Sequence, residues 1–72
     1  MTLNDVTVGN SVLVEKILVK GALKRRLMDM GLTKGTQVTV QKVAPLGDPI
    51  QIQVRGYELS IRKEEAQQIV VA

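Results

Sequence analysis

The segment IQIQVRGYELSIR, residues 50–62, decides the fold because apolar and polar residues alternate along it. Residues 50–54 place three β-branched side chains on one face of a strand and polar side chains on the other. The alternation is interrupted at Gly56 and Tyr57 and resumes over residues 58–62. The segment therefore predicts an antiparallel hairpin that turns at Gly56 and lays one face on a hydrophobic core.

Three other segments carry strand patterns. Residues 36–43 alternate in the same way until the phase shifts near Lys42, which predicts a bulge or bend at that point. Residues 11–19 predict a strand with one phase change, and residues 69–71 predict a short last strand. Five short strands within 72 residues predict a mainly β fold, with a single domain over residues 1–72. We expect closure into one small barrel because closure removes exposed strand edges.

One segment has helical spacing. Residues 22–30 place two leucines and a methionine at positions i, i+4 and i+7, and this apolar face is expected to cover one end of the barrel. Gly31 ends the helix, and Leu32 then lies where it can pack back on Leu27. A shorter helical turn is predicted over residues 63–67, where two glutamates favour the first turn.

The composition excludes several classes of function. The chain has no cysteine and no histidine, so thiolate and imidazole metal sites, Cys or His nucleophiles and the usual general base near neutral pH are absent. Its carboxylates are scattered, and we expect no cofactor and no metal site beyond a weak surface contact. The sequence predicts a binding protein and not an enzyme. No stretch is long and apolar enough for membrane insertion or for a secretory signal, which predicts a cytoplasmic protein.

The segment Pro45-Leu46-Gly47-Asp48-Pro49 is the first candidate binding site. It lies between two predicted strands and contains both prolines of the chain, so it should form a stiff loop. Such a loop could present Leu46 to a partner as an apolar knob that loses little entropy on binding. The alternative is a structural turn with Leu46 folded back over the barrel.

A basic cluster around the predicted helix is the second candidate. Lys24, Arg25 and Arg26, with Lys20 just before them, could meet phosphate groups or an acidic protein surface. A solvated helix face is the simpler interpretation, with Lys24, Arg25 and Asp29 in water. An arginine here could also enter a nucleotide site of a partner and stabilise charge during phosphoryl transfer.

The order and spacing of several segments resemble the ferrous iron transport protein A (FeoA) family, over nearly the whole chain. The segments that carry the resemblance are Leu3 with Gly9, residues 26–32 with Lys34-Gly35, residues 45–49, and residues 61–66 followed by 69–71. Met30 and Ile61 stand where leucine is common in the family, and both replacements conserve size and polarity.

The resemblance implies an SH3-like barrel of about five strands with a helical insertion after the first. It also implies a non-enzymatic cytoplasmic regulator that works with FeoB, a membrane transporter with a cytosolic GTP-binding region, in bacterial ferrous iron uptake. A proline-rich ligand is not expected, because Tyr57 is the only aromatic residue.

We therefore expect an adaptor that contacts FeoB through residues 45–49, with Lys24, Arg25 and Arg26 as an electrostatic supplement. Self-association that covers strand edges is left open, and nucleic acid is not expected as a partner. The alternative function is a nucleic-acid-associated small barrel, because the net charge is +3 and the sequence pI is about 9.6. A third alternative is the SH3-like domain of iron-dependent repressors. A start at Met1 with no helix-turn-helix attached is expected to favour a standalone protein over that alternative.

Overall fold

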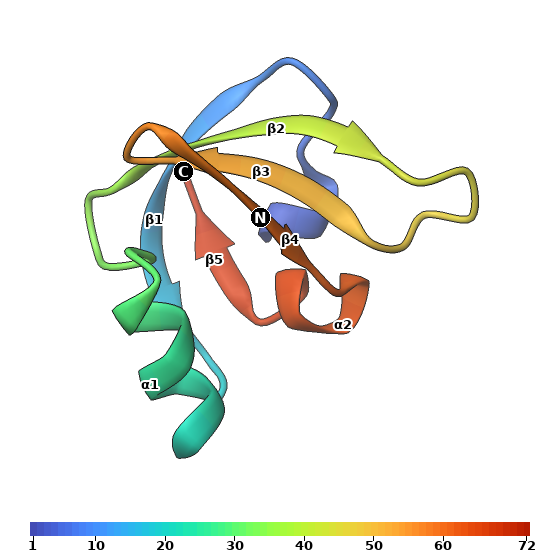
Figure 1. Ribbon diagram of the computed structural model, residues 1–72. Coiled ribbons are helices and arrows are strands. Elements are labelled where there is room, and N and C mark those ends of the chain that lie inside the picture. Colours follow the sequence, from blue (N-terminus) through green and yellow to red (C-terminus); the bar gives the residue numbers. More distant parts are fainter.

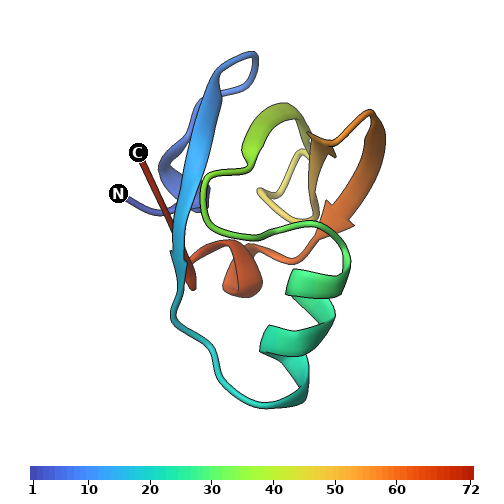
Figure 2. The same ribbon diagram turned by 90° about the vertical axis from the view of Figure 1, so that its left-hand side faces the viewer.

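The computed structural model describes residues 1–72 and shows a curled antiparallel sheet of five strands (Figures 1 and 2). The strand order is β4-β3-β2-β1-β5, so β4 and β5 form the two ends of the sheet. The elements in chain order are the 3-10 helix η1 (Leu3–Asp5), β1 (Ser11–Ile17), α1 (Ala22–Asp29), β2 (Gln37–Val43), β3 (Ile50–Val54), β4 (Tyr57–Ile61), α2 (Lys63–Ala66) and β5 (Ile69–Val71).

The structure confirms the expected pairing of β3 with β4. The turn of this hairpin lies one residue earlier than the sequence pattern predicts. Val54 pairs with Tyr57, so the turn consists of Arg55 and Gly56 alone. Both have positive φ, 49° and 86°, as a two-residue type I′ turn requires. The expectation that Tyr57 interrupts the strand pattern is therefore wrong, because Tyr57 is the first residue of β4.

Irregularities in β2 and β1 make the sheet curl. The pairing of β2 with β3 shifts register between Val40 and Lys42, which confirms the predicted bulge. In β1, residues 11–13 pair with β2, whereas residues 14–17 pair with β5 across a second register shift. This strand ends at Ile17, two residues before the predicted end.

The sheet does not close completely. No hydrogen-bonded pairing joins β4 to β5, so the expected closure of the barrel is incomplete at these two strands. The chain crosses this gap in α2, which lies between the two strands in Figure 1. Ala66 of α2 is fully buried. A short helix thus covers the opening that strand pairing would otherwise close.

The core is entirely aliphatic. Its 14 buried hydrophobic residues come from all five strands, from all three helices and from the loop after α1. They are Leu3, Val14, Ile17, Leu27, Leu32, Val38, Val40, Ile50, Ile52, Val54, Ile61, Ala66, Ile69 and Val71. Removal of these side chains from water is the main favourable term in folding of so small a chain.

Helix α1 meets this core at one end of the sheet, as predicted. Leu27 is fully buried, while Leu23 and Met30 are partly buried against the core. The helix ends in a Schellman motif, in which the Gly31 amide donates to the Met28 carbonyl at 3.0 Å and the Leu32 amide donates to the Leu27 carbonyl at 3.1 Å.

The ends of the chain lie together. Thr2 forms an isolated bridge with Val70, and the Val71 amide donates to the Met1 carbonyl at 2.9 Å. The intervening helix η1, which the sequence pattern did not reveal, buries Leu3 completely. The first residues therefore cover the outer edge of β5.

Candidate protein-binding site

The loop between β2 and β3, residues 44–49, projects from the sheet (Figure 1). The Ala44 amide donates to the Pro49 carbonyl at 3.1 Å, and the Gly47 amide donates to the Ala44 carbonyl at 2.7 Å. Gly47 has a φ of +85°, a conformation in which a side chain would be strained. Although these hydrogen bonds hold the loop, Leu46 is 94% exposed, so it does not fold back over the barrel.

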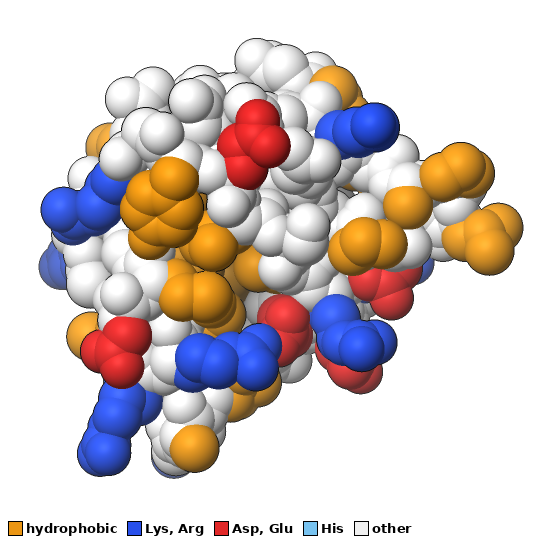
Figure 3. Space-filling view, in the orientation of Figure 1, with side chains coloured by type: hydrophobic (Ala, Val, Ile, Leu, Met, Phe, Trp, Pro, Cys, Tyr) orange, Lys and Arg blue, Asp and Glu red, His pale blue; other side chains and the backbone are white.

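The surroundings of Leu46 are also apolar. Val43, Pro45 and Pro49 are exposed on the same projection. Figure 3 shows hydrophobic side chains gathered at the projecting end of the molecule. We call Val43, Pro45, Leu46 and Pro49 the loop tip. A contiguous exposed group of this kind on a small protein is typical of an interaction surface.

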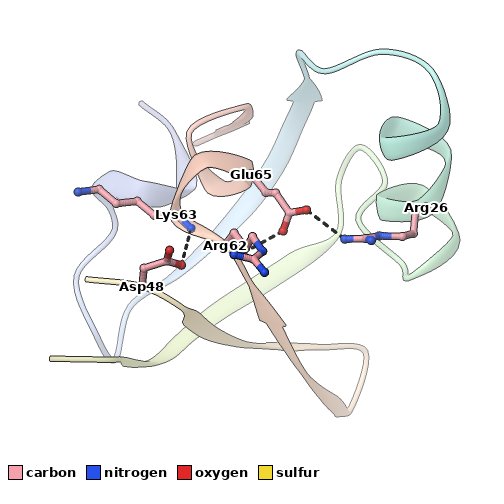
Figure 4. Close-up of polar contacts among 5 residues, drawn as sticks. All are labelled: Arg26, Asp48, Arg62, Lys63 and Glu65. Atoms are coloured by element: carbon pink, nitrogen blue, oxygen red, sulfur yellow. Dashed lines mark hydrogen bonds and ion pairs between the residues drawn. The ribbon is translucent and has the colours of Figure 1, made fainter. Parts of the chain in front are cut away.

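Asp48 has a structural contact that the sequence did not indicate. Its Oδ1 atom accepts a hydrogen bond from the Lys63 amide at 3.0 Å, which joins the loop to the first turn of α2 (Figure 4). The Lys63 amide has no acceptor within its own helix, so the carboxylate satisfies a helix-end donor. Asp48 therefore helps hold the loop in place.

The basic cluster on α1 divides into two kinds of residue. Lys24 and Arg25 are exposed and form no ion pair. Arg26 donates from Nη2 to Oε2 of Glu65 at 3.0 Å. The positive charge of Arg26 is thus partly neutralised, whereas Lys24 and Arg25 remain available to an acidic surface. The i, i+4 pair Arg25 and Asp29 forms no ion pair.

Glu65 links two elements through its two carboxylate oxygens. Oε2 accepts from Arg26, and Oε1 accepts from the Arg62 amide at 2.9 Å (Figure 4). The residue is only 8% exposed. A buried carboxylate must keep such partners, because burial without them is costly. No sequence pattern signals either contact, because the capping-box signature has Ser, Thr, Asp or Asn at the position that Arg62 occupies.

The two predicted contact regions do not form one surface. In Figure 1 the β2–β3 loop projects at one end of the molecule, and α1 lies at the opposite end. Helix α2 lies between them and contacts both, through Lys63 and Glu65. A partner that used both regions would have to extend across this side of the molecule.

No group of three or more acidic side chains is close enough together to hold a metal ion. None of the helices has the length and apolar character that crossing a bilayer demands.

Comparison with known proteins defines the class and then the family. In its fold this chain is similar to the FeoA of Stenotrophomonas maltophilia, a prokaryotic SH3 domain protein solved in complex with zinc, at 32% identity and a TM-score of 0.88. The match covers 100% of this chain and 89% of that one. The predicted SH3-like fold is thereby confirmed. The FeoA domain family matches residues 1–72, and the chain belongs to that family.

Two further relatives extend this result. A solved FeoA-like protein of Clostridium acetobutylicum is 42% identical, with a TM-score of 0.90, over 100% of this chain and 84% of the other. A Porphyromonas gingivalis protein, the Fe(2+) transport protein A/Fe(2+) transporter FeoB fusion protein, is 31% identical over 71 residues. That match covers 99% of this chain but only 8% of the relative's length. The family is a non-catalytic accessory of ferrous iron transport, in agreement with the expectation that the chain is not an enzyme.

Proposed function

We propose that the chain is a small cytoplasmic regulator of ferrous iron uptake that acts by direct contact with FeoB. The observation that carries this proposal is the fusion in Porphyromonas gingivalis, where an FeoA region and an FeoB transporter form one polypeptide. Covalent linkage raises the effective concentration of two domains that act together. The Stenotrophomonas FeoA is suggested to be a bacterial ferrous iron transport activating factor, which supports activation as the direction of the proposed effect.

The loop tip is the main contact in this proposal. Leu46 is almost fully exposed, yet its loop is held by internal hydrogen bonds and by the contact between Asp48 and Lys63. A knob that is already ordered loses little entropy when it enters an apolar pocket. Pro45, Gly47, Asp48 and Pro49 act mainly by keeping the loop in this conformation.

Lys24 and Arg25 supply a second, electrostatic contribution, with Arg26 contributing less because it is paired with Glu65. Exposed charges at the rim of an interface mainly change the association rate and its dependence on salt. We therefore expect Lys24→Ala and Arg25→Ala to slow association at low salt and to change the affinity little at high salt.

The test is calorimetric titration of the chain into the cytosolic region of FeoB from the same genome, with GTP and GDP analogues and at two salt concentrations. Leu46→Asp should weaken the affinity by about tenfold or more, because it places a charge in an apolar contact. Val8→Asp is the matched control, since Val8 is exposed on a different loop. This control should bind like the unmodified chain.

The possible results distinguish the parts of the proposal. If the Leu46→Asp and Val8→Asp variants bind FeoB equally well, the proposal that the loop tip is the contact is overturned. Absence of binding in titration and in a second method would overturn the direct contact with this region of FeoB. In that case, affinity for RNA or DNA that falls steeply with salt would support the nucleic-acid alternative.

A further inference from the structure

Strand β4 has an outer edge with which no other strand of the chain pairs, and its residues Glu58 and Ser60 are exposed. It pairs only with β3, on one side. In a hairpin closed by a two-residue turn, Tyr57, Leu59 and Ile61 direct their backbone groups toward β3, and Glu58 and Ser60 direct theirs outward. Neither Glu58 nor Ser60 takes part in any backbone hydrogen bond outside the regular elements. Their outward N–H and C=O groups are therefore free to pair with another strand.

The two edges of the sheet differ in this respect. The outer edge of β5 is covered by the bridge between Thr2 and Val70 and by the hydrogen bond between Val71 and Met1. Open strand edges readily template pairing with a further strand unless they are short, bulged, charged or covered. The pairing of β4 with β3 is regular, without a register shift.

The side chains beside this edge are partly apolar. Leu59 is half-buried, and Tyr57 remains 42% exposed although its hydroxyl donates to the Met30 carbonyl. Figure 3 shows hydrophobic side chains on the face between the β3–β4 turn and α1. A strand added to β4 would cover part of this surface, which would add apolar burial to the backbone hydrogen bonds.

We propose that the partner at this edge is a second copy of the chain, with the two β4 strands antiparallel and centred on Leu59. In this register Leu59 lies opposite Leu59 of the second copy. Glu58 lies opposite Ser60 of the second copy, and each such pair exchanges both backbone hydrogen bonds. The arrangement is two-fold symmetric, as contacts between identical chains usually are.

The charges on the strand favour this register. Glu58 lies diagonal to Arg62 of the second copy on one side and to Glu58 of the second copy on the other. The symmetric register therefore contains two attractive diagonal pairs and one repulsive pair. Diagonal neighbours are about 7–8 Å apart and within reach of long side chains. Because Ser60 is neutral, no like charges lie directly opposite each other among residues 58–60.

This proposal does not depend on the proposed function, because it uses β4 and not the loop tip. Only Glu58 and Ser60 offer open backbone groups, so the contact is small and the association is weak. The mass must therefore be measured by sedimentation equilibrium over a wide concentration range. The unmodified chain should show a reversible rise from monomer to dimer.

Complementary charge variants give the decisive test. Glu58→Arg makes all three diagonal pairs repulsive through like positive charges, and Arg62→Glu makes them repulsive through negative charges. For each variant alone, the dissociation constant of the dimer should rise about fivefold or more. An equimolar mixture of the two makes every diagonal pair attractive, so it should dimerise more tightly than the unmodified chain.

Matched controls separate the effect of charges at the β4 edge from the effect of the net charge of the chain. Glu15→Arg and Lys16→Glu make the same charge changes at exposed positions on β1 and should leave dimerisation nearly unchanged. Ser60→Pro removes an outward N–H without removing a β3–β4 hydrogen bond, and should abolish the dimer while the far-ultraviolet circular dichroism spectrum is kept. A chain that stays monomeric throughout, or a dimer that the β4 variants and their mixture leave unchanged, would overturn the proposal.

Discussion

Arg26 on α1 and Glu65 on α2 are 39 positions apart in the sequence and are joined by a hydrogen bond of 3.0 Å. The side chain of Arg26 is 63% exposed, whereas that of Glu65 is only 10% exposed. Removal of one side chain should therefore lower the free energy of unfolding by a different amount from removal of the other. Loss of the arginine leaves a carboxylate that still accepts from the Arg62 amide, whereas loss of the glutamate removes both contacts.

We predict that Glu65→Ala lowers the free energy of unfolding by about 1–3 kcal/mol, because it removes a helix cap and an ionic contact together. Arg26→Ala should cost at most about 1 kcal/mol, since the arginine is mostly in water. Urea unfolding of both variants and of the double variant measures these values. Equal costs for the two single variants would contradict the greater importance of the cap.

Asp48 should contribute to stability through α2 and not only through its own loop. Asp48→Ala leaves the Lys63 amide without its acceptor and should lower the free energy of unfolding by about 1 kcal/mol. Asp48→Asn keeps an oxygen acceptor and should cost clearly less. NMR relaxation at residues 45–49 should show a more mobile loop in the alanine variant. A loop of unchanged order in that variant would show that Asp48 does not hold it.

Gly31 should resist substitution more strongly than Gly35. Both have positive φ, +102° and +87°, so alanine is strained at either position. A Cβ atom on Gly31 would lie 3.2 Å from Cδ of Arg55 and 3.3 Å from Cγ1 of Val54, whereas one on Gly35 would have no atom within 4 Å. We expect Gly35→Ala to cost about 1 kcal/mol and Gly31→Ala about 1 kcal/mol more. Chemical denaturation of the pair checks the difference.

Leu46 should be dispensable for folding. Because its side chain is 94% exposed, Leu46→Asp should change the free energy of unfolding by less than about 0.5 kcal/mol. Leu27 is the opposite case, since it is fully buried, and Leu27→Ala should cost about 2–5 kcal/mol. Thermal unfolding separates the two, and a clear loss of stability in Leu46→Asp would show that this side chain packs on the fold.

The parts of the fold that sequence predicted correctly depend on neighbours within a few positions. The alternation in residues 50–54, the phase shift near Lys42 and the helix end at Gly31 each reflect the backbone of a single segment. Tyr57 was misjudged because a type I′ turn needs a positive φ at Arg55, which is unusual for a residue other than glycine.

Long-range relationships could not be predicted in this way. The open gap between β4 and β5 depends on how α2 packs, and nothing in either strand indicates it. The candidate site shows the same limit. The stiff loop at residues 45–49 follows from its prolines, but the outward direction of Leu46 and the contact of Asp48 with Lys63 depend on segments brought together by folding.

Helix α2 is four residues long and supports two elements that do not contact one another through any hydrogen bond. Native-state hydrogen exchange therefore has a specific expected outcome. A local opening that melts α2 releases the Asp48 loop and the contact with α1 in a single event, so the three segments should exchange as one cooperative unit. A ligand that ordered the loop would then slow exchange in α1, although it touched no atom of that helix.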